Sequence, residues 1–179
     1  MLKYSLQEMS INGDDLMIIL GIDPGIATVG YGIISAANGR FSPIDYGTIT
    51  TKAGVLLEKR LCEIYDCVTE LIRRYSPDAV AIEELFFNKN VKTAIDVAQG
   101  RGAILTAVAK SGIDLFEYTP LQVKSSVVGY GRAEKQQVMY MIKVLLNLNS
   151  TPKPDDTADA LAIAICHANF SMHTTAKRE

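Results

Sequence analysis

Four acidic side chains, far apart in the chain, have the chemistry to hold divalent cations together. Asp23 ends an apolar segment and precedes a Pro-Gly turn, and Glu83 interrupts the apolar run of residues 79–85. Asp156 and Asp159 are three residues apart, so they would share one face of a helix. Oxygen ligands without histidine or cysteine suit Mg²⁺ or Mn²⁺, and two such ions about 4 Å apart promote phosphodiester hydrolysis. The set therefore indicates a metal-dependent hydrolase acting on phosphodiesters.

Each of these acids also has a purely structural interpretation. An aspartate before Pro-Gly is commonly a turn residue, and a glutamate in a strand can be paired at the edge of a core. Asp156 can cap a helix N-terminus. Asp159 is harder to explain as a cap, because the segment is already turning apolar there. The combination of the four acids, more than any one of them, indicates a metal site.

The spacing of apolar residues predicts the elements that must position these acids. Strands are predicted at residues 17–23, 29–36, 41–51, 79–85 and 115–118, and helices at 55–75, 91–110, 119–128, 134–148 and 155–170. The first three strands follow one another through tight turns, and the later strands alternate with helices. The alternating part is a βαβ arrangement, which indicates an α/β fold with a parallel portion in its sheet.

Length and composition indicate one domain. The 179 residues are 48% hydrophobic and 21% charged. Residues 1–16 are interpreted as a disordered extension or an expression remnant, 17–170 as a single nuclease domain and 171–179 as a short C-terminal tail. No apolar run near the start is long enough for a signal sequence or a membrane span, so a cytoplasmic protein without a membrane partner is expected.

The three cysteines have no C-x-x-C spacing, which excludes a zinc finger. Because each lies in an apolar helical pattern, we interpret them as small core residues of a protein in a reducing compartment.

The formal net charge of −2 does not exclude a nucleic-acid ligand. Residues 17–179 carry 17 basic and 17 acidic side chains, and two divalent cations on the four carboxylates would leave this part with a net charge of +4. Residues 89–110 contain four basic side chains and only one acidic side chain, that of Asp96. Such a basic stripe can follow a DNA backbone. These cations are Lys89, Lys92, Arg101 and Lys110.

Four stretches resemble the RuvC-type Holliday-junction endonucleases: LGIDPGIATVGYGII (20–34), AIEELFF (81–87), FEYTPLQVKSSVVGYGRAEKQQV (116–138) and DDTADALAIAICH (155–167). The similarity runs from Met17 to about Asn169. It implies a ribonuclease H-like fold, a five-stranded mixed sheet flanked by helices. It also implies a homodimer that resolves four-way DNA junctions in recombination and repair by paired symmetric nicks. A branch-migration helicase complex is a further implied partner.

The resemblance also assigns roles to residues. Asp23, Glu83, Asp156 and Asp159 match the family's four metal-binding catalytic acids, which implies two Mg²⁺ per active site, with Mn²⁺ as a substitute. Lys124 and Lys135 match catalytic basic residues near the scissile phosphate. Phe86 matches an aromatic residue at the junction centre. The implied DNA-binding residues are Phe86, Lys89, Lys92, Arg101, Lys124, Arg132 and Lys135.

These assignments also have simpler alternatives. Either lysine could be solvated on a helix face, and Phe86 could pack in the core. A junction-binding protein without nuclease activity would need a broken acidic set, and none of the four acids is missing here. Actin-like and sugar-kinase ATPases also begin with an apolar strand and an acidic turn, but they need two such domains. Junction cleavage and ATP-binding assays separate these classes.

Overall fold

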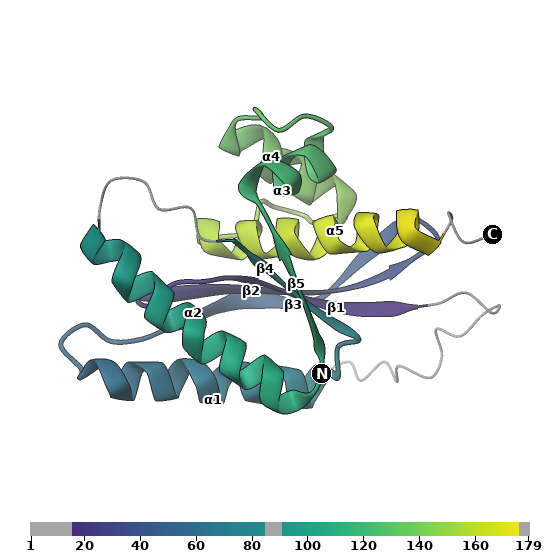
Figure 1. The fold of residues 1–179 in the computed structure, drawn as a ribbon. Helices are drawn as coiled ribbons and strands as arrows, with labels where there is room; N and C mark the ends of the chain where they lie inside the picture. Colours follow the sequence, from purple (N-terminus) through teal and green to yellow (C-terminus); the bar gives the residue numbers. More distant parts are fainter. Residues whose placement is uncertain (1–15, 85–90, 176–179) are drawn as a thin grey trace.

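The computed structural model describes residues 16–84 and 91–175, which form one sheet with helices on both faces (Figure 1). The strands are β1 (Met17–Asp23), β2 (Thr28–Ala37), β3 (Arg40–Thr50), β4 (Ala79–Glu83) and β5 (Asp114–Tyr118). The helices are α1 (Leu57–Tyr75), α2 (Val91–Ser111), α3 (Pro120–Val128), α4 (Lys135–Leu145) and α5 (Asp155–Thr175).

The strand order is β3-β2-β1-β4-β5. Strands β1, β2 and β3 pair antiparallel, whereas β1 pairs parallel with β4 and β4 pairs parallel with β5. The expected five-stranded mixed sheet flanked by helices is therefore confirmed. The antiparallel half comes from the tight turns near the start of the chain, and the parallel half needs the helical crossovers α1 and α2.

Two predicted helix ends differ from the structure. Helix α4 ends at Leu145, before the predicted residue 148, because Asn147 has a φ of 48° in the left-handed region. Helix α5 continues to Thr175, five residues past the expected boundary between domain and tail.

One face of the sheet is covered by α1 and α2; in Figure 1, α1 lies below the sheet and α2 runs diagonally from the upper left to the lower centre. Helix α1 is amphipathic and buries Ile64, Val68 and Ile72. These branched side chains join Leu20 and Ile33 of the sheet in one apolar cluster. This face is held together in the usual way, by a helix stripe packed on a half-buried sheet.

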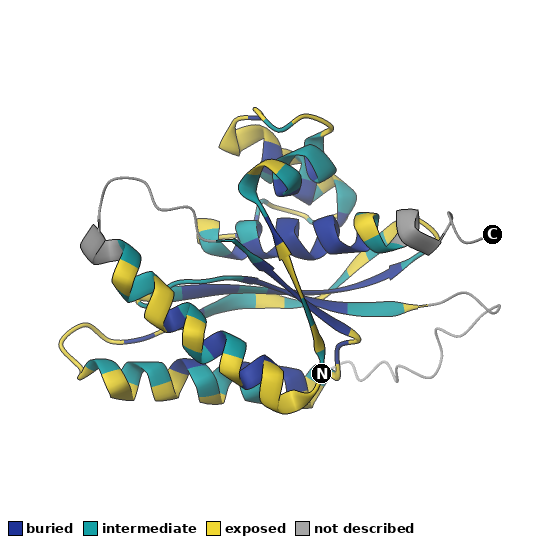
Figure 2. Ribbon diagram, viewed as in Figure 1, coloured by how far each residue is buried: buried dark blue, intermediate teal, exposed yellow. Residues whose placement is uncertain are grey.

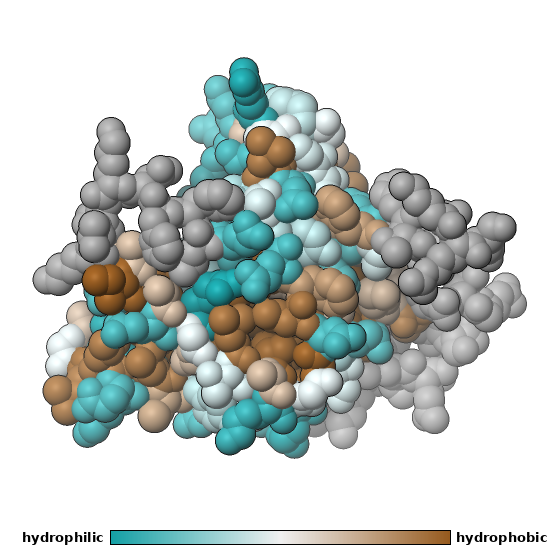
Figure 3. Space-filling view, in the orientation of Figure 1, coloured by the Kyte–Doolittle hydropathy of each residue, from teal (hydrophilic) through white to brown (hydrophobic). Residues whose placement is uncertain are grey.

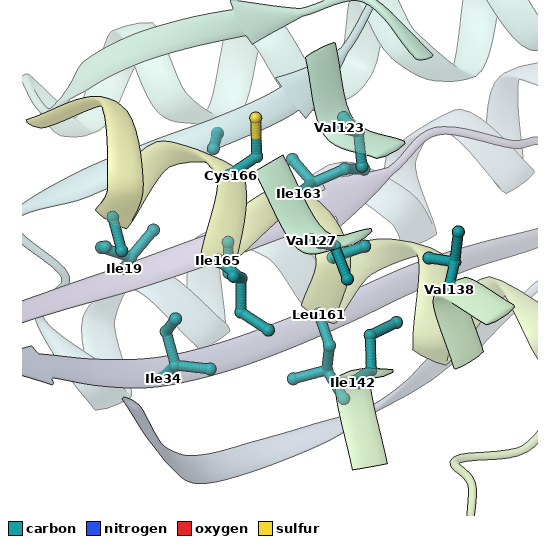
Figure 4. Close-up of a cluster of buried hydrophobic side chains, with 14 of the residues drawn as sticks. Ile19, Ile34, Val123, Val127, Val138, Ile142, Leu161, Ile163, Ile165 and Cys166 are labelled. Carbon is teal, nitrogen blue, oxygen red and sulfur yellow. The ribbon is translucent and has the colours of Figure 1, made fainter. Parts of the chain in front are cut away.

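Helix α5 lies across the opposite face, between the sheet and the pair α3 and α4 (Figure 1). Residues 160–168 of α5 are all buried, as the dark blue stretch in Figure 2 shows. Figure 4 shows Leu161 and Ile165 of this helix among side chains from β1, β2, α3 and α4. Within residues 16–84 and 91–175, neither α5 nor another helix is long and apolar enough to cross a membrane.

The cysteines do not all behave as predicted. Cys166 is buried in α5, but Cys67 is only partly buried and Cys62 is exposed. The interpretation of Cys62 as a core residue is wrong, because it lies on the solvent side of the amphipathic helix α1.

Candidate active site

Asp23 and Glu83 come together at the carboxyl ends of two neighbouring parallel strands. In the register of β1 and β4, Ile22 lies opposite Ile82, and each acid follows directly. Side chains alternate along a strand, so Asp23 points to the same face as Ile19, which packs in the α5 cluster. The structure thus places both acids on the α5 side of the sheet, at the edge where α/β proteins commonly bind ligands.

Asp156 and Asp159 reach the same place because α5 begins directly above β2. Gly30 is the register partner of Asp23. A Cβ atom on Gly30 would lie only 2.0 Å from the backbone oxygen of Asp156, so this close approach requires glycine. The first turn of α5 can therefore rest on the strand beside Asp23.

The four acids repel one another, and Asp23 shows this most. Burial, followed by the charges of Asp159, Glu83 and Asp156, raises the pKa of Asp23 from 3.8 to about 8. Lys135 acts in the opposite direction but does not cancel the increase. Three separate acids influence one carboxyl, so the four acids lie close enough to interact.

The pKa values of Glu83 and Asp159 are raised, as that of Asp23 is. Burial and the charge of Asp159 raise the pKa of Glu83, whereas Lys124 and Lys135 lower it. Burial also raises the pKa of Asp159, against the hydrogen bond and charge of Lys135. Carboxyls whose pKa values are raised by burial and by neighbouring acids are the groups whose charged form a cation would stabilise.

Lys135 lies beside this cluster and forms ion pairs with two aspartates. Its Nζ lies 3.1 Å from Oδ2 of Asp159 and 3.2 Å from Oδ2 of Asp155. Although partial burial opposes it, the bonds and charges of the two aspartates raise the pKa of Lys135. Lys135 is the first residue of α4, whose start is fixed by a capping box between Glu134 and Gln137.

Asp155 is a neighbour of the site that the sequence analysis does not single out. Its carboxylate shares Lys135 with that of Asp159. Two adjacent aspartates at a helix start were the available signal.

The other predicted basic residues are more scattered. Lys124, on α3, is close enough to lower the pKa of Glu83. Arg132 is exposed in the loop before Lys135. Arg101 hydrogen-bonds Glu117 on β5, and its side chain is only 15% exposed, so it ties α2 to the sheet edge. Lys92 lies in α2, its side chain outside the described part.

Two further predicted residues, Phe86 and Lys89, lie outside the described residues.

The donor set fits Mg²⁺ in its chemistry, because it consists of carboxylate oxygens. Over residues 16–84 and 91–175, no three Asp, Glu, His or Cys side chains are gathered tightly enough to form a finished metal site. Asp23, Glu83, Asp156 and Asp159 are the residues that would hold such a cation, whose positive charge would offset their mutual repulsion.

Comparison with known proteins agrees with this geometry. A family profile described as crossover junction endodeoxyribonuclease RuvC matches residues 19–167. A relative with that name from Ruminiclostridium cellulolyticum is 60% identical over 153 residues, covering 86% of this chain and 92% of the relative.

A solved structure of Thermus thermophilus RuvC with a Holliday junction substrate is similar with a TM-score of 0.85 at 34% identity, covering 89% of this chain and 97% of that one. The yeast mitochondrial Holliday junction resolvase, at 16% identity and a TM-score of 0.66, shares the fold. The expected ribonuclease H-like fold is thus confirmed. On the family match and these identities, the chain belongs to the RuvC family of crossover junction endodeoxyribonucleases.

Proposed function

We propose that this chain resolves Holliday junctions by paired symmetric nicks, through hydrolysis of one phosphodiester per active site. The observation that carries the proposal is the meeting of Asp23 with three other acids at the ends of β1 and β4. The Thermus thermophilus relative, which shares the fold over 89% of this chain, was solved with a Holliday junction. The geometry and the family membership thus support the same substrate.

In this proposal Asp23, Glu83, Asp156 and Asp159 hold two Mg²⁺ ions, for which Mn²⁺ substitutes. Such a pair supplies activation of the attacking water and charge stabilisation at the leaving oxygen. The carboxylates would bind and orient the metal ions, and their burial limits the access of water to the site. Lys135 and Lys124 stand beside the acids and would stabilise negative charge that develops on the phosphate.

The DNA would lie across the end of the sheet that carries these acids. We infer backbone contacts from Lys124, Arg132 and Lys135, with Lys89 and Lys92 further along and Phe86 stacking at the junction centre. Arg101 already has Glu117 as its partner, so its expected contribution to DNA binding is the smallest.

A homodimer matches the two-fold symmetry of paired nicks. Strand β5 has a neighbour on one side alone in the described sheet, and Phe116 on it is 40% exposed. Figure 3 shows apolar side chains gathered on the face that carries α2 and β5, which a second copy would cover. A helicase partner and a cytoplasmic location remain predictions consistent with a DNA substrate.

The first experiment is cleavage of a synthetic mobile four-way junction, beside linear duplex and a Y-shaped fork, in Mg²⁺ and in EDTA. We expect symmetric nicks in the junction alone, abolished by EDTA. Binding without nicks would favour a non-catalytic junction binder. A protein that neither binds nor nicks the junction would contradict the proposed function.

Asp23→Asn tests the acidic set. Loss of one metal ligand should reduce cleavage by about 1,000-fold or more while junction binding is retained, because binding rests on the basic residues. The measurement pairs single-turnover cleavage with a gel-shift titration. Asp78→Asn is the matched control: Asp78 precedes β4 and bonds the N–H of Ile18, far along the strand from the site. Near wild-type cleavage by Asp23→Asn would reject the assignment.

A further inference from the structure

The loop after Asp23, residues 24–27, is fixed by Arg60 of α1 and by Thr51, the residue that follows β3. Arg60, in the first turn of α1, donates from Nη2 to the carbonyl oxygen of Ile26 at 3.1 Å and from Nε to the hydroxyl of Thr51 at 2.8 Å. Thr51 donates its own hydroxyl to the same carbonyl of Ile26. Its N–H bonds the carbonyl of Ala27 at 3.0 Å. Two successive loop carbonyls are thus held by two residues.

These contacts belong to a built network. Thr51 is buried, with 7% exposure, and its hydroxyl both accepts from Arg60 and donates to Ile26. A guanidinium that makes two directed bonds from a fixed plane restrains its partners more than a flexible ammonium would. The network spans the end of β3, the start of α1 and the β1–β2 loop.

The loop is also confined from the other side. A Cβ atom on Gly100 of α2 would lie 2.3 Å from the carbonyl oxygen of Gly25, so α2 rests directly on the loop. The segment that follows Asp23 is therefore clamped between Gly100 and the Arg60–Thr51 pair. Both helices contribute to the site indirectly, although neither supplies one of the four acids.

The clamp bears on the position of Asp23. Asp23 is the last residue of β1 and the clamped loop begins at the next residue, so the loop fixes how the chain leaves the strand at Asp23. We propose that Arg60, acting through Thr51 and residues 24–27, is a positioning residue that holds Asp23 in place for metal-dependent cleavage. The inference rests on the proposed function.

Four substitutions test this role. Arg60→Gln removes the guanidinium, and Thr51→Val removes the bridging hydroxyl while keeping the side-chain volume. Thr51→Ser keeps the hydroxyl and is the conservative rescue. Arg73→Gln, on the exposed side of the same helix, breaks only an ion pair with Glu70 and is the control.

We expect Arg60→Gln and Thr51→Val to lower cleavage at saturating junction and Mg²⁺ by about tenfold or more, because small misplacements of reacting groups are costly. Junction binding in EDTA should not change. Hydrogen exchange of the peptide covering residues 24–28, measured without metal, should become faster. Thr51→Ser and Arg73→Gln should behave as wild type in all three measurements.

Three results would overturn the inference. Weaker junction binding with an unchanged saturating rate would make Arg60 a phosphate contact. A lower melting temperature with wild-type cleavage and loop exchange would leave it a stabilising residue only. If Thr51→Ser cleaved the junction as slowly as Thr51→Val, the hydroxyl would not be the group that matters at this position. A wild-type protein that does not cut the junction would instead count against the proposed function, whereas the loop-exchange comparison would still test the clamp.

Discussion

The two faces of the sheet are packed by different kinds of residue. On the α1 and α2 face, branched side chains such as Ile64 and Ile104 fill the space between helix and sheet. On the α5 face the helix lies so close that its backbone meets glycines of the strands, and its buried residues include a series of alanines. These alanines are Ala158, Ala160, Ala162, Ala164 and Ala168.

The two kinds of packing suit different roles: the α1 and α2 face contributes mainly to stability, and the α5 face positions the acids. A layer of large side chains tolerates small shifts of a helix, because side chains can repack. Backbone against backbone leaves no such freedom, since neither surface can rearrange. The four acids all belong to the α5 face, where the relative position of helix and strand is fixed most tightly.

Among the substitutions that test this difference between the two faces, Gly30→Ala has the largest expected effect on cleavage, because it would break this close approach. The new Cβ would meet the backbone oxygen of Asp156, so the first turn of α5 must move away from Asp23. We expect cleavage to fall by about 100-fold, because the acids no longer converge. Stability should fall by about 1–3 kcal/mol from overpacking. Single-turnover cleavage and urea unfolding measure the two effects.

Gly102→Ala is the matched control for this prediction. Gly102 lies in α2 with open space where its Cβ would be, so the same chemical change meets no obstacle. Alanine should stabilise the helix by up to about 1 kcal/mol and leave cleavage unchanged. Equal losses of cleavage in the two variants would show that the close approach at Gly30 is not what matters.

Ile64→Ala tests the opposite face. Ile64 is fully buried in the α1 cluster, and its truncation should cost about 2–5 kcal/mol in the free energy of unfolding. Cleavage at saturating junction, measured well below the lowered melting temperature, should stay close to wild type. A loss of rate comparable to that of Gly30→Ala would mean that the two faces do not differ in this way.

Much of the fold was predictable because its signals are local. The apolar period of α1 and the turn after Asp23 identify their elements without knowledge of the partners, and predicted and observed bounds agree within a few residues at most ends. The burial of residues 160–168 of α5 has a local signal as well, because the sequence after the first turn is nearly all apolar. The resemblance implied one five-stranded mixed sheet, whereas the strand order was not predicted and comes from the structure.

The residues of the candidate site could be named from the sequence, but the contacts between them could not. The four acids could be named from their types, whereas their mutual repulsion depends on the register of β1 with β4 and on the glycine beneath Asp156. Arg101 resembled a free cation in sequence, and its partner Glu117 is 16 residues away on another element. The Arg60–Thr51 clamp likewise joins groups with no shared motif.

The charge of the α5 face should also make stability depend on pH. The folded pKa of Asp23 is about 8, above the ordinary 3.8, so the folded protein keeps a proton that the unfolded chain releases. Without metal, the free energy of unfolding should therefore fall as pH rises from about 4 to about 8. Glu83 and Asp159, whose pKa values are also raised, contribute with the same sign.

Urea unfolding in EDTA at several pH values between 5 and 8 measures this slope. Asp23→Asn cannot titrate, so its slope should be shallower, and the variant should be more stable than wild type near pH 8. Ile64→Ala should keep the wild-type slope at a lower overall stability, because the substitution removes no titrating group and Ile64 packs in the cluster on the other face of the sheet. An identical slope in wild type and Asp23→Asn would contradict the assignment of the titration to Asp23.

Lys135→Gln has the smallest expected effect and sharpens the account of the α5 face. The side chain is 49% exposed, so its charge is partly screened by solvent. We expect cleavage at saturating Mg²⁺ to fall by about tenfold, less than a buried oxyanion donor would cost. Lys143→Gln, in the last turn of the same helix, is the control and should leave the rate unchanged.

The Mg²⁺ dependence distinguishes two roles for Lys135. As a transition-state contact, its removal lowers the rate even when Mg²⁺ is saturating. As a counter-charge that occupies Asp159 in the absence of metal, its removal would instead free a ligand, and half-maximal cleavage would need less Mg²⁺. An unchanged maximal rate with a lower Mg²⁺ requirement would therefore assign Lys135 to the metal-free state and leave Lys124 as the basic residue that faces the phosphate.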